Sequence, residues 1–347
     1  MKVSAQLSLI LAAVGWGSAT TATKYALGGF GPSTLLLVKL AAAAAVLWAV
    51  VAVHGLPRVE RKGRFAWLGL FEPTLAYGAL TLGLSYTTAT NASLLGASEA
   101  CFVVALAAVF LKERLSARAL VGLLLAVVGV LLIEQIFTVS ADLNVGDLLV
   151  LGGNLAAAIY VILAAKVAPT VDALSLTAYQ FAFGTALSLP FALWQWASGR
   201  EPLPTDVDLI YWTVAALIGG VGFAGSFLLY NYVIRFVPAG LAGVTLNLVP
   251  LFGVLTAILF LGEQLSVWTV TGGIAVLAGI MLFPADKQDQ AGRTAGRDLV
   301  RYASVSAFSS AGGGRIVPFA PGPAPAGLAR GPVPAGSSAA DSYRRDR

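Results

Sequence analysis

The chain has 347 residues, of which 58% are hydrophobic and only 11% are charged, and its mean hydropathy is +0.82. Soluble domains carry about a quarter charged residues, so this composition excludes an ordinary soluble protein and indicates a protein that lies in lipid. The single Cys101 excludes an internal disulfide and a multi-cysteine metal site, and the single His54 argues against a histidine-based catalytic triad or zinc site.

Ten stretches of the sequence are apolar over a length close to the roughly 20 residues that a membrane-spanning helix needs. They cover residues 5–27, 32–53, 65–86, 90–111, 117–136, 146–167, 173–196, 209–233, 240–261 and 265–284. The first stretch follows Lys2 but runs past Trp16 without a convincing cleavage site, which predicts a retained helix instead of a secretory signal. Most connections are short, which predicts antiparallel neighbouring helices.

The last segment, residues 285–347, differs from the rest because it is rich in Ala, Gly, Pro, Ser and Arg and shows no periodicity. This composition predicts a disordered tail. The tail carries nine Lys or Arg and five Asp residues, so most of the net charge of +5 comes from it. We therefore expect no nucleic-acid partner.

Basic residues in the predicted connections lie almost all on one side of the membrane. The connections on the side of the amino terminus contain Lys2, Arg58, Arg61, Lys62, Arg64, Lys112, Arg114, Arg118, Lys166 and Arg235. The opposite connections contain only Arg200. Cytoplasmic loops are enriched in Lys and Arg, so we expect a multi-pass protein of the plasma membrane with both termini in the cytoplasm.

The sequence contains an internal repeat. Segment 111–116, Leu-Lys-Glu-Arg-Leu-Ser, recurs 150 residues later at 261–266 as Leu-Gly-Glu-Gln-Leu-Ser. Residues at the same offset also match, namely Phe102 with Phe252, Val104 with Val254, Ala107 with Ala257, Phe110 with Phe260, Gly122 with Gly272 and Gly129 with Gly279. Earlier in the two copies the match is weaker, and Lys39 corresponds to Gln180.

The fold class that follows is an all-α membrane protein of ten transmembrane helices in two inverted repeats, residues 1–137 and 138–284. Each repeat holds five helices, and an odd number inverts the second copy. The first Glu-x-Leu-Ser turn is flanked by basic residues, whereas Gln264 and Trp268 stand at two of those places in the second turn. Inverted repeats place a binding site near the midplane between the halves and permit alternating access.

Several motifs in order make the sequence resemble the drug/metabolite transporter superfamily, EamA type, over about residues 5–284. They are Trp16-Gly17-Ser18, Glu72-Pro73-Thr74-Leu75-Ala76-Tyr77, Thr87-Thr88-Ala89-Thr90-Asn91-Ala92-Ser93-Leu94-Leu95 and the two Glu-x-Leu-Ser turns. The resemblance implies ten helices and movement of small metabolites, often amino acids or related compounds, coupled in many members to protons. The sequence departs from the family where Ala100 replaces a frequent proline and Lys39 a common arginine.

Charged residues inside a span are costly and usually face a cavity or one another. Glu99 lies nine residues past Thr90, about 13.5 Å along a helix, which is near the midplane. It is predicted to be a proton-coupling carboxylate or an anchor for a substrate amine, with a permanent salt bridge to a buried lysine as the alternative. Lys39 is predicted to pair with Glu99, the favoured interpretation, or to bind a substrate carboxylate.

Three further residues are candidates for the substrate or coupling site. Trp16 lies mid-span, away from the interface where tryptophan usually settles, so we expect it to line a cavity, with packing against other helices as the alternative. Asn247 precedes Pro250 in the helix that corresponds by symmetry to the one carrying Glu99. Glu72 precedes Pro73, so we expect it either to form part of a gate or to support a kink in the helix. Other buried amides and phenols, Gln180 and Asn154 among them, are expected to form interhelical hydrogen bonds.

Glu113 and Glu263 occupy the two repeat turns, and each is predicted to cap the N-terminus of the helix that follows it, with gating as the alternative. The segment 220–225 matches a Gly-x-Gly-x-x-Gly fingerprint but lies inside an apolar span, so it predicts close helix packing instead of nucleotide binding.

We therefore expect a secondary active transporter that exports a small polar metabolite by proton-coupled alternating access. No ATP-binding motif occurs in the sequence, so the energy would come from an ion gradient. The alternatives are a membrane sensor or receptor without transport, or a carrier of nucleotide sugars or drugs. No enzyme activity, cofactor or metal is expected. The expected partners are the metabolite and the bilayer, and a homodimer is left open.

Overall fold

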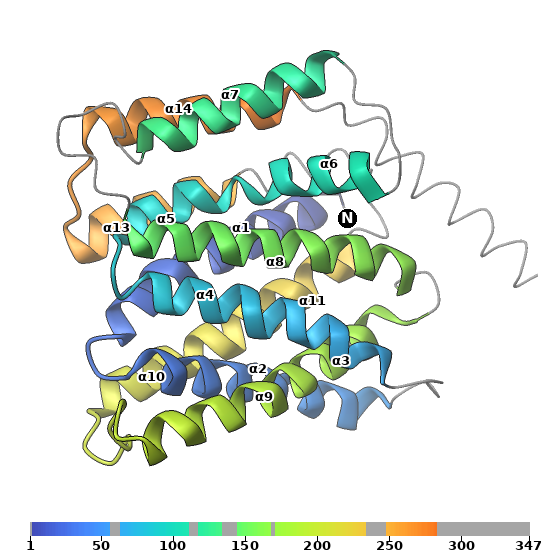
Figure 1. Ribbon diagram of the computed structural model, residues 1–347. Helices are drawn as coiled ribbons and strands as arrows, with labels where there is room; N and C mark the ends of the chain where they lie inside the picture. Colours follow the sequence, from blue (N-terminus) through green and yellow to red (C-terminus); the bar gives the residue numbers. More distant parts are fainter. Residues whose placement is uncertain are drawn as a thin grey trace, which may run out of the picture. The chain divides into compact units, whose positions relative to one another are not determined.

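The computed structural model describes residues 2–55, 63–110, 117–133, 144–167, 171–233 and 248–282. Helices and short connections make up these residues, and no strand occurs among them, which agrees with the predicted all-helical class (Figure 1). The helices are α1 (Lys2–Ala26), α2 (Pro32–His54), α3 (Arg64–Gly69), η1 (Leu70–Leu75), α4 (Ala76–Gly83), α5 (Ala89–Gly96), α6 (Glu99–Phe110), α7 (Ala117–Ile133), α8 (Val145–Val167), α9 (Ala173–Ala197), α10 (Leu209–Leu217), η3 (Ile218–Gly225), α11 (Ser226–Val233), α13 (Leu248–Leu261) and α14 (Val267–Met281).

Four helices in these ranges are long and apolar enough to cross a membrane, judged by length and composition. They are Pro32–Val53, Val145–Ala164, Leu174–Ala197 and Leu209–Tyr230. The first predicted span corresponds to the 25-residue helix α1, which is not among these four. The remaining predicted spans consist of shorter helical pieces or extend into residues outside the described ranges, so the count of ten stays a prediction. The tail at 285–347 and the first repeat turn at 111–116 also lie outside the described residues.

Polar residues set the ends of several helices. The side chains of Thr88, Asp172 and Ser266 accept hydrogen bonds from backbone N–H groups three residues further on, at 3.0, 3.0 and 2.9 Å. These bonds satisfy N–H groups that have no partner inside α5, α9 and α14. Gly262, with a φ of +66°, permits the tight turn between α13 and α14.

Helices from the two predicted repeats, 1–137 and 138–284, pack on one another within one compact unit. The contacts join α1 to α13 and α11, α2 to α9 and η3, α4 and α6 to α8, α5 to α13, and α7 to α14. Figure 1 shows α7 beside α14 and α4 beside α8. The boundaries of the two repeats stay a prediction.

Glycines allow α7 and α14 to touch along their backbones. A Cβ atom at Gly272 would lie 2.6 Å from the Gly129 carbonyl oxygen, and one at Gly279 would lie 2.5 Å from the Gly122 oxygen. Small residues at helix interfaces in membranes allow this close approach, which adds dispersion contacts along both helices. The glycines that match in the sequence repeat are therefore the ones at which these helices meet.

Replacing Gly272 by Ala is expected to destabilise the protein by about 1–3 kcal/mol, because the added methyl group overlaps the Gly129 backbone, which cannot rotate away. The control is Gly152→Ala in the middle of α8, where a Cβ atom meets nothing within 4 Å. That control removes only the conformational cost of glycine and should stabilise by up to about 1 kcal/mol. Thermal unfolding of the detergent-solubilised variants measures both, and equal melting temperatures would contradict the prediction.

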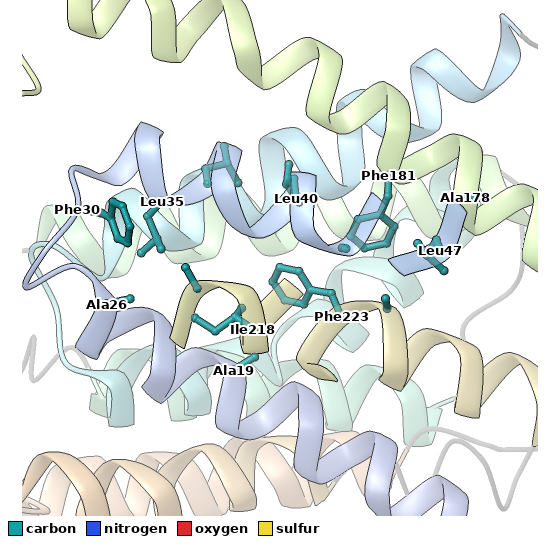
Figure 2. Packing of buried hydrophobic residues seen from close by; sticks show 14 of the residues in the cluster. Ala19, Ala26, Phe30, Leu35, Leu40, Leu47, Ala178, Phe181, Ile218 and Phe223 are labelled. Atoms are coloured by element: carbon teal, nitrogen blue, oxygen red, sulfur yellow. The ribbon is translucent and has the colours of Figure 1, made fainter. Parts of the chain in front are cut away.

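The largest core cluster lies where α2 packs against α9 and η3 (Figure 2). Phe181 on α9 and Phe223 on η3 face each other there with ring centroids 6.2 Å apart, and Leu40 on α2 belongs to the same cluster. Gly219 brings η3 against the backbone of α2, since its Cβ atom would lie 2.3 Å from the Lys39 carbonyl oxygen. The glycine-rich segment therefore serves helix packing, as the sequence predicted.

Candidate functional site

Glu72 lies at a break in the helical segment that runs from α3 through η1 to α4. Its backbone is extended, with φ of −141° and ψ of 119°, and a cis peptide bond joins it to Pro73. The Thr74 hydroxyl donates to the Gly69 carbonyl oxygen across the break at 2.7 Å. The Glu72 side chain is 8% exposed, and its carboxyl group shares a hydrogen bond with the Tyr77 hydroxyl of α4. The break therefore places a carboxyl group inside the bundle.

Helix α9 packs directly on this break. The fully buried Gln180 donates from Nε2 to the Glu72 carbonyl oxygen at 2.9 Å, and its Oε1 accepts from the Tyr160 hydroxyl of α8, also at 2.9 Å. A Cβ atom at Gly184 would lie 2.5 Å from Pro73 Cγ, so glycine is needed there for the irregular backbone to approach α9. The second half of the chain thus surrounds the break that carries Glu72.

Glu99 is the first residue of α6, immediately after the short turn that separates α6 from α5. Asn154 of α8 donates from Nδ2 to the Leu95 carbonyl oxygen at 2.8 Å and to the Ser98 hydroxyl at 3.2 Å, both beside this turn. The Glu99 carboxyl group interacts electrostatically with Glu72. The structure therefore brings together two acidic residues that the sequence singled out separately.

Lys39 of α2 is fully buried, and hydroxyl groups surround its amine. Nζ donates to Thr81 Oγ1 at 2.5 Å, lies 3.5 Å from Thr23 Oγ1, and stands 5.6 Å from the centroid of the Phe223 ring. In the part of the chain that the structure describes, Lys39 forms no ion pair, so the favoured pairing with Glu99 is wrong. The reason is that α2 packs against α4 and η3, which present hydroxyl and aromatic groups to the lysine.

An aromatic pair connects the lysine to the acidic residues. The Tyr77 ring stacks on Phe223 with centroids 4.4 Å apart and an interplanar angle of 15°, while the Tyr77 hydroxyl reaches Glu72. The face of an aromatic ring carries negative potential, which favours a nearby cation such as Lys39. A lysine and two acidic residues therefore lie at the two ends of one cluster in the bundle, which we call the central cluster: Glu72, Glu99, Tyr77, Phe223 and Lys39.

Trp16 of α1 lies against two aromatic residues of α11. Its ring packs edge-on against Phe227 and Tyr230, with centroids 5.1 and 5.6 Å away. The indole Nε1 is buried and has no hydrogen-bond partner among the described residues. A buried donor without a partner is uncommon, and the side chain is only partly buried as a whole. The placement fits the prediction that Trp16 lines a substrate site, which stays a prediction.

Glu263 caps a different helix from the one predicted. Its carboxylate accepts from the backbone N–H groups of Ala89 and Thr90, both at 2.8 Å, at the start of α5. The helix that follows Glu263, α14, is capped by Ser266 instead. Because α5 packs against α13, the turn that ends α13 lies beside the N-terminus of α5. The expectation that Glu263 caps its own following helix is therefore wrong.

Polar side chains also bond backbone groups at the start of α2 and near the end of α4. Glu201 accepts from the Ser33 and Thr34 backbone N–H groups at 2.9 and 3.0 Å, at the start of α2. The Lys24 amine donates to the Leu84 and Thr87 carbonyl oxygens near the end of α4, at 2.5 and 2.6 Å. Asp147 of α8 accepts from the Thr87 hydroxyl.

Two of the predicted site residues, Asn247 and Glu113, lie outside the described residues, so their roles stay predictions. Glu201, Thr81 and Phe223 carry no signal in the sequence that marks them as site residues. Phe223 lies within the glycine-rich segment that was assigned to packing alone. No periodicity marks Thr81 or Phe223, because the helices that carry them are apolar around most of their circumference, and Glu201 lies in the connection between α9 and α10.

Comparison with known proteins gives a consistent result. Residues 3–135 and residues 144–283 each match the EamA-like transporter family. An uncharacterized transporter of Archaeoglobus fulgidus is 35% identical over 229 residues, which are 64% of this chain and 76% of that protein. A probable terminal-alkyne amino-acid exporter of Streptantibioticus cattleyicolor is 27% identical over 286 residues, 81% of this chain and 94% of that protein. One crystal structure shares the fold, with a TM-score of 0.55 and 16% identity over 81% of this chain and 96% of the other.

Proposed function

Because the chain belongs to the EamA-like transporter family, we propose that it is a secondary active transporter that exports a small polar metabolite, an amino acid or a related compound, by proton-coupled alternating access. The observation that carries this proposal is the neighbouring pair Glu72 and Glu99, each at a helix break inside the bundle. Discontinuous helices near the midplane are where such carriers bind their substrates and coupling ions.

The contacts between helices support a repeat of two equivalent halves, and the odd number of predicted spans in each half is what would invert the second one. The first and sixth predicted spans, which contain α1 and α8, correspond to each other, and so do the fourth and ninth, which contain α6 and α13. Helix α1 contacts α13, and the corresponding pair, α8 and α6, is also in contact. The pairs α2 with α9 and α7 with α14 each join a helix to its own counterpart. The irregular segments η1 and η3 also fall in corresponding spans, the third and the eighth. This arrangement would let the two halves rock about a shared central site.

The chemistry of the central cluster suits a substrate with both charges. Two neighbouring carboxylates in a water-poor site repel each other, and a proton or a substrate ammonium group relieves the repulsion. Competition between a proton and the substrate for this pair is the basis of antiport. Lys39 lies at the other end of the cluster, where a substrate carboxylate would find a cation that already has hydroxyl neighbours.

Transport by purified protein in proteoliposomes tests the proposal. With a mixture of tritiated common amino acids outside and an acidic lumen, we expect accumulation of label that a protonophore abolishes, because protons leaving the lumen drive the substrate inward. Chromatography of the accumulated label then identifies the substrate. Failure to move any amino acid, both under the gradient and in exchange, would contradict the proposal and favour the sensor alternative.

The orientation is proposed on the distribution of basic residues in the connections. Arg200 belongs to the connection between α9 and α10, and Arg118 belongs to the start of α7, which the sequence places on the cytoplasmic side. We propose a plasma-membrane protein whose termini both lie in the cytoplasm.

A further inference from the structure

Both acidic residues of the central cluster lie beside a backbone irregularity, and at each irregularity a side-chain amide from the second half bonds a first-half carbonyl oxygen. Gln180 donates to the carbonyl oxygen of Glu72 itself. Asn154 donates to the carbonyl oxygen of Leu95 and to the Ser98 hydroxyl, next to Glu99. The two amides come from α9 and α8, and the two acids come from the segments that hold η1 and α6.

We propose that Gln180 and Asn154 are positioning residues that fix the carboxyl groups of Glu72 and Glu99 and link them to the movement of the second half. The proposal rests on the proposed transport function of the acidic pair. Neither amide is assigned contact with the substrate. Each acts through the backbone that carries a carboxyl group.

A helix break in lipid leaves carbonyl oxygens without their usual N–H partners, and each one left unpaired is costly. At η1 the Gln180 amide supplies such a donor to the Glu72 carbonyl oxygen. The Leu95 carbonyl oxygen already accepts from the Ser98 backbone N–H at 2.8 Å, so Asn154 adds a second bond there, and each amide fixes the direction of the backbone that it bonds. At η1 the direction matters because Glu72 is extended while its neighbours are helical. Without the Gln180 bond, the Glu72 peptide could rotate and carry the carboxyl group away from Tyr77 and Glu99.

Gln180 has a second bond that links it to the same group of side chains. Its Oε1 accepts from the Tyr160 hydroxyl, and Tyr160 interacts electrostatically with both Glu72 and Glu99. Among the residues that the structure describes, the titratable groups that face the acidic pair from the surrounding helices are Tyr77 on α4 and Tyr160 on α8. When the halves rock, α8 and α9 move relative to η1 and α6, and the two amide bonds transmit that movement to the carboxyl groups.

A third amide provides a matched control. Asn144 also crosses between the predicted halves, because its Nδ2 donates to the Tyr86 carbonyl oxygen at 3.2 Å. This bond is exposed and lies at the end of α4, where no residue of the central cluster is found. Losing it removes a cross-half hydrogen bond without touching a break that carries an acid.

The experiment compares Gln180→Met, Asn154→Leu and Asn144→Ala with the unaltered chain in proteoliposomes, using the tritiated amino-acid mixture as the probe. The pH of half-maximal uptake is expected to move by about one unit in the first two variants, which corresponds to about a tenfold change in proton affinity. Protons moved per labelled amino acid, measured with a lumenal pH dye, should fall in both. Asn144→Ala should change neither quantity.

A merely structural role would lower the amount of folded protein and the maximal rate, but would leave the pH midpoint unchanged. Unchanged midpoints in both variants would therefore overturn the proposal, as would a shift of equal size in Asn144→Ala. Should Gln180→Met not fold, Gln180→Asn keeps an amide that is too short to reach both partners, and the same shift is expected. If the unaltered chain moves no amino acid, the proposed function itself has failed, which is a separate outcome.

Discussion

The Glu99→Gln variant is expected to lose gradient-driven uptake almost completely while it continues to exchange substrate across the membrane. Glutamine keeps the size and hydrogen-bonding capacity of the side chain, but it cannot release a proton and does not repel Glu72. Exchange requires only that the loaded carrier reorients, whereas accumulation requires that a proton be carried in the opposite direction. Parallel assays of counterflow and of uptake into acidic proteoliposomes separate the two quantities.

The matched control for this variant is Glu263→Gln. Glu263 is also a partly buried carboxylate, but it bonds the backbone N–H groups of Ala89 and Thr90 at the start of α5. An amide oxygen can still accept one of those bonds, so uptake per folded molecule should stay within about twofold of the original value. Gradient-driven uptake that survives in Glu99→Gln would assign proton coupling to another group.

The positions of the helices could largely be predicted from the sequence. The stretch 32–53 corresponds to α2, and the stretch 173–196 corresponds to α9. Length and hydropathy determine such segments, because lipid requires a continuous apolar helix of a given length. Pro32 and Ser266 mark helix starts by known local chemistry, which the sequence displays directly.

The partners of the polar residues could not be predicted in the same way. The sequence favoured Glu99 as the partner of Lys39, and the structure gives Lys39 the hydroxyls of Thr81 and Thr23. Equal numbers of buried acidic and basic residues suggest ion pairs, but the packing of the helices determines which side chains face one another. In helices that are apolar around most of their circumference, no stripe of hydrophobic residues identifies the inward face. The same reason explains why Glu263 was assigned to the wrong helix.

The central cluster lies between these two cases. Glu72 and Glu99 could be identified from the sequence because each is a charged residue inside an apolar span. This pattern identifies individual residues, not their partners. The sequence did not indicate that the two acidic residues interact, or that Gln180 donates a hydrogen bond to the backbone of Glu72. Those relations depend on a helix break whose geometry only the fold determines. Lys39 and Gln180 occupy corresponding positions in the two repeats. Both side chains are buried and form hydrogen bonds to neighbouring helices, so the repeat did indicate that Gln180 has a structural role.

The Lys39→Met variant is expected to lose transport of substrates that carry a carboxylate, and to fold at least as stably as the original chain. The side chain of Lys39 is fully buried, and its amine contacts two hydroxyls and an aromatic ring among the described residues. Keeping an amine without an acidic partner out of water costs free energy, and a methionine of similar length removes that cost, so we expect the free energy of unfolding to be unchanged or higher. Activity and stability should therefore change in opposite directions, which a general packing defect would not produce.

Lys24→Met is the control, because the Lys24 amine bonds carbonyl oxygens near the end of α4 and lies outside the central cluster. Its loss removes a cation from a helix C-terminus and should destabilise by up to about 1 kcal/mol, without changing transport per folded molecule. Thermal unfolding and counterflow with labelled amino acids measure both effects. Transport of an amino acid at the original rate by Lys39→Met would show that the buried cation serves the fold alone.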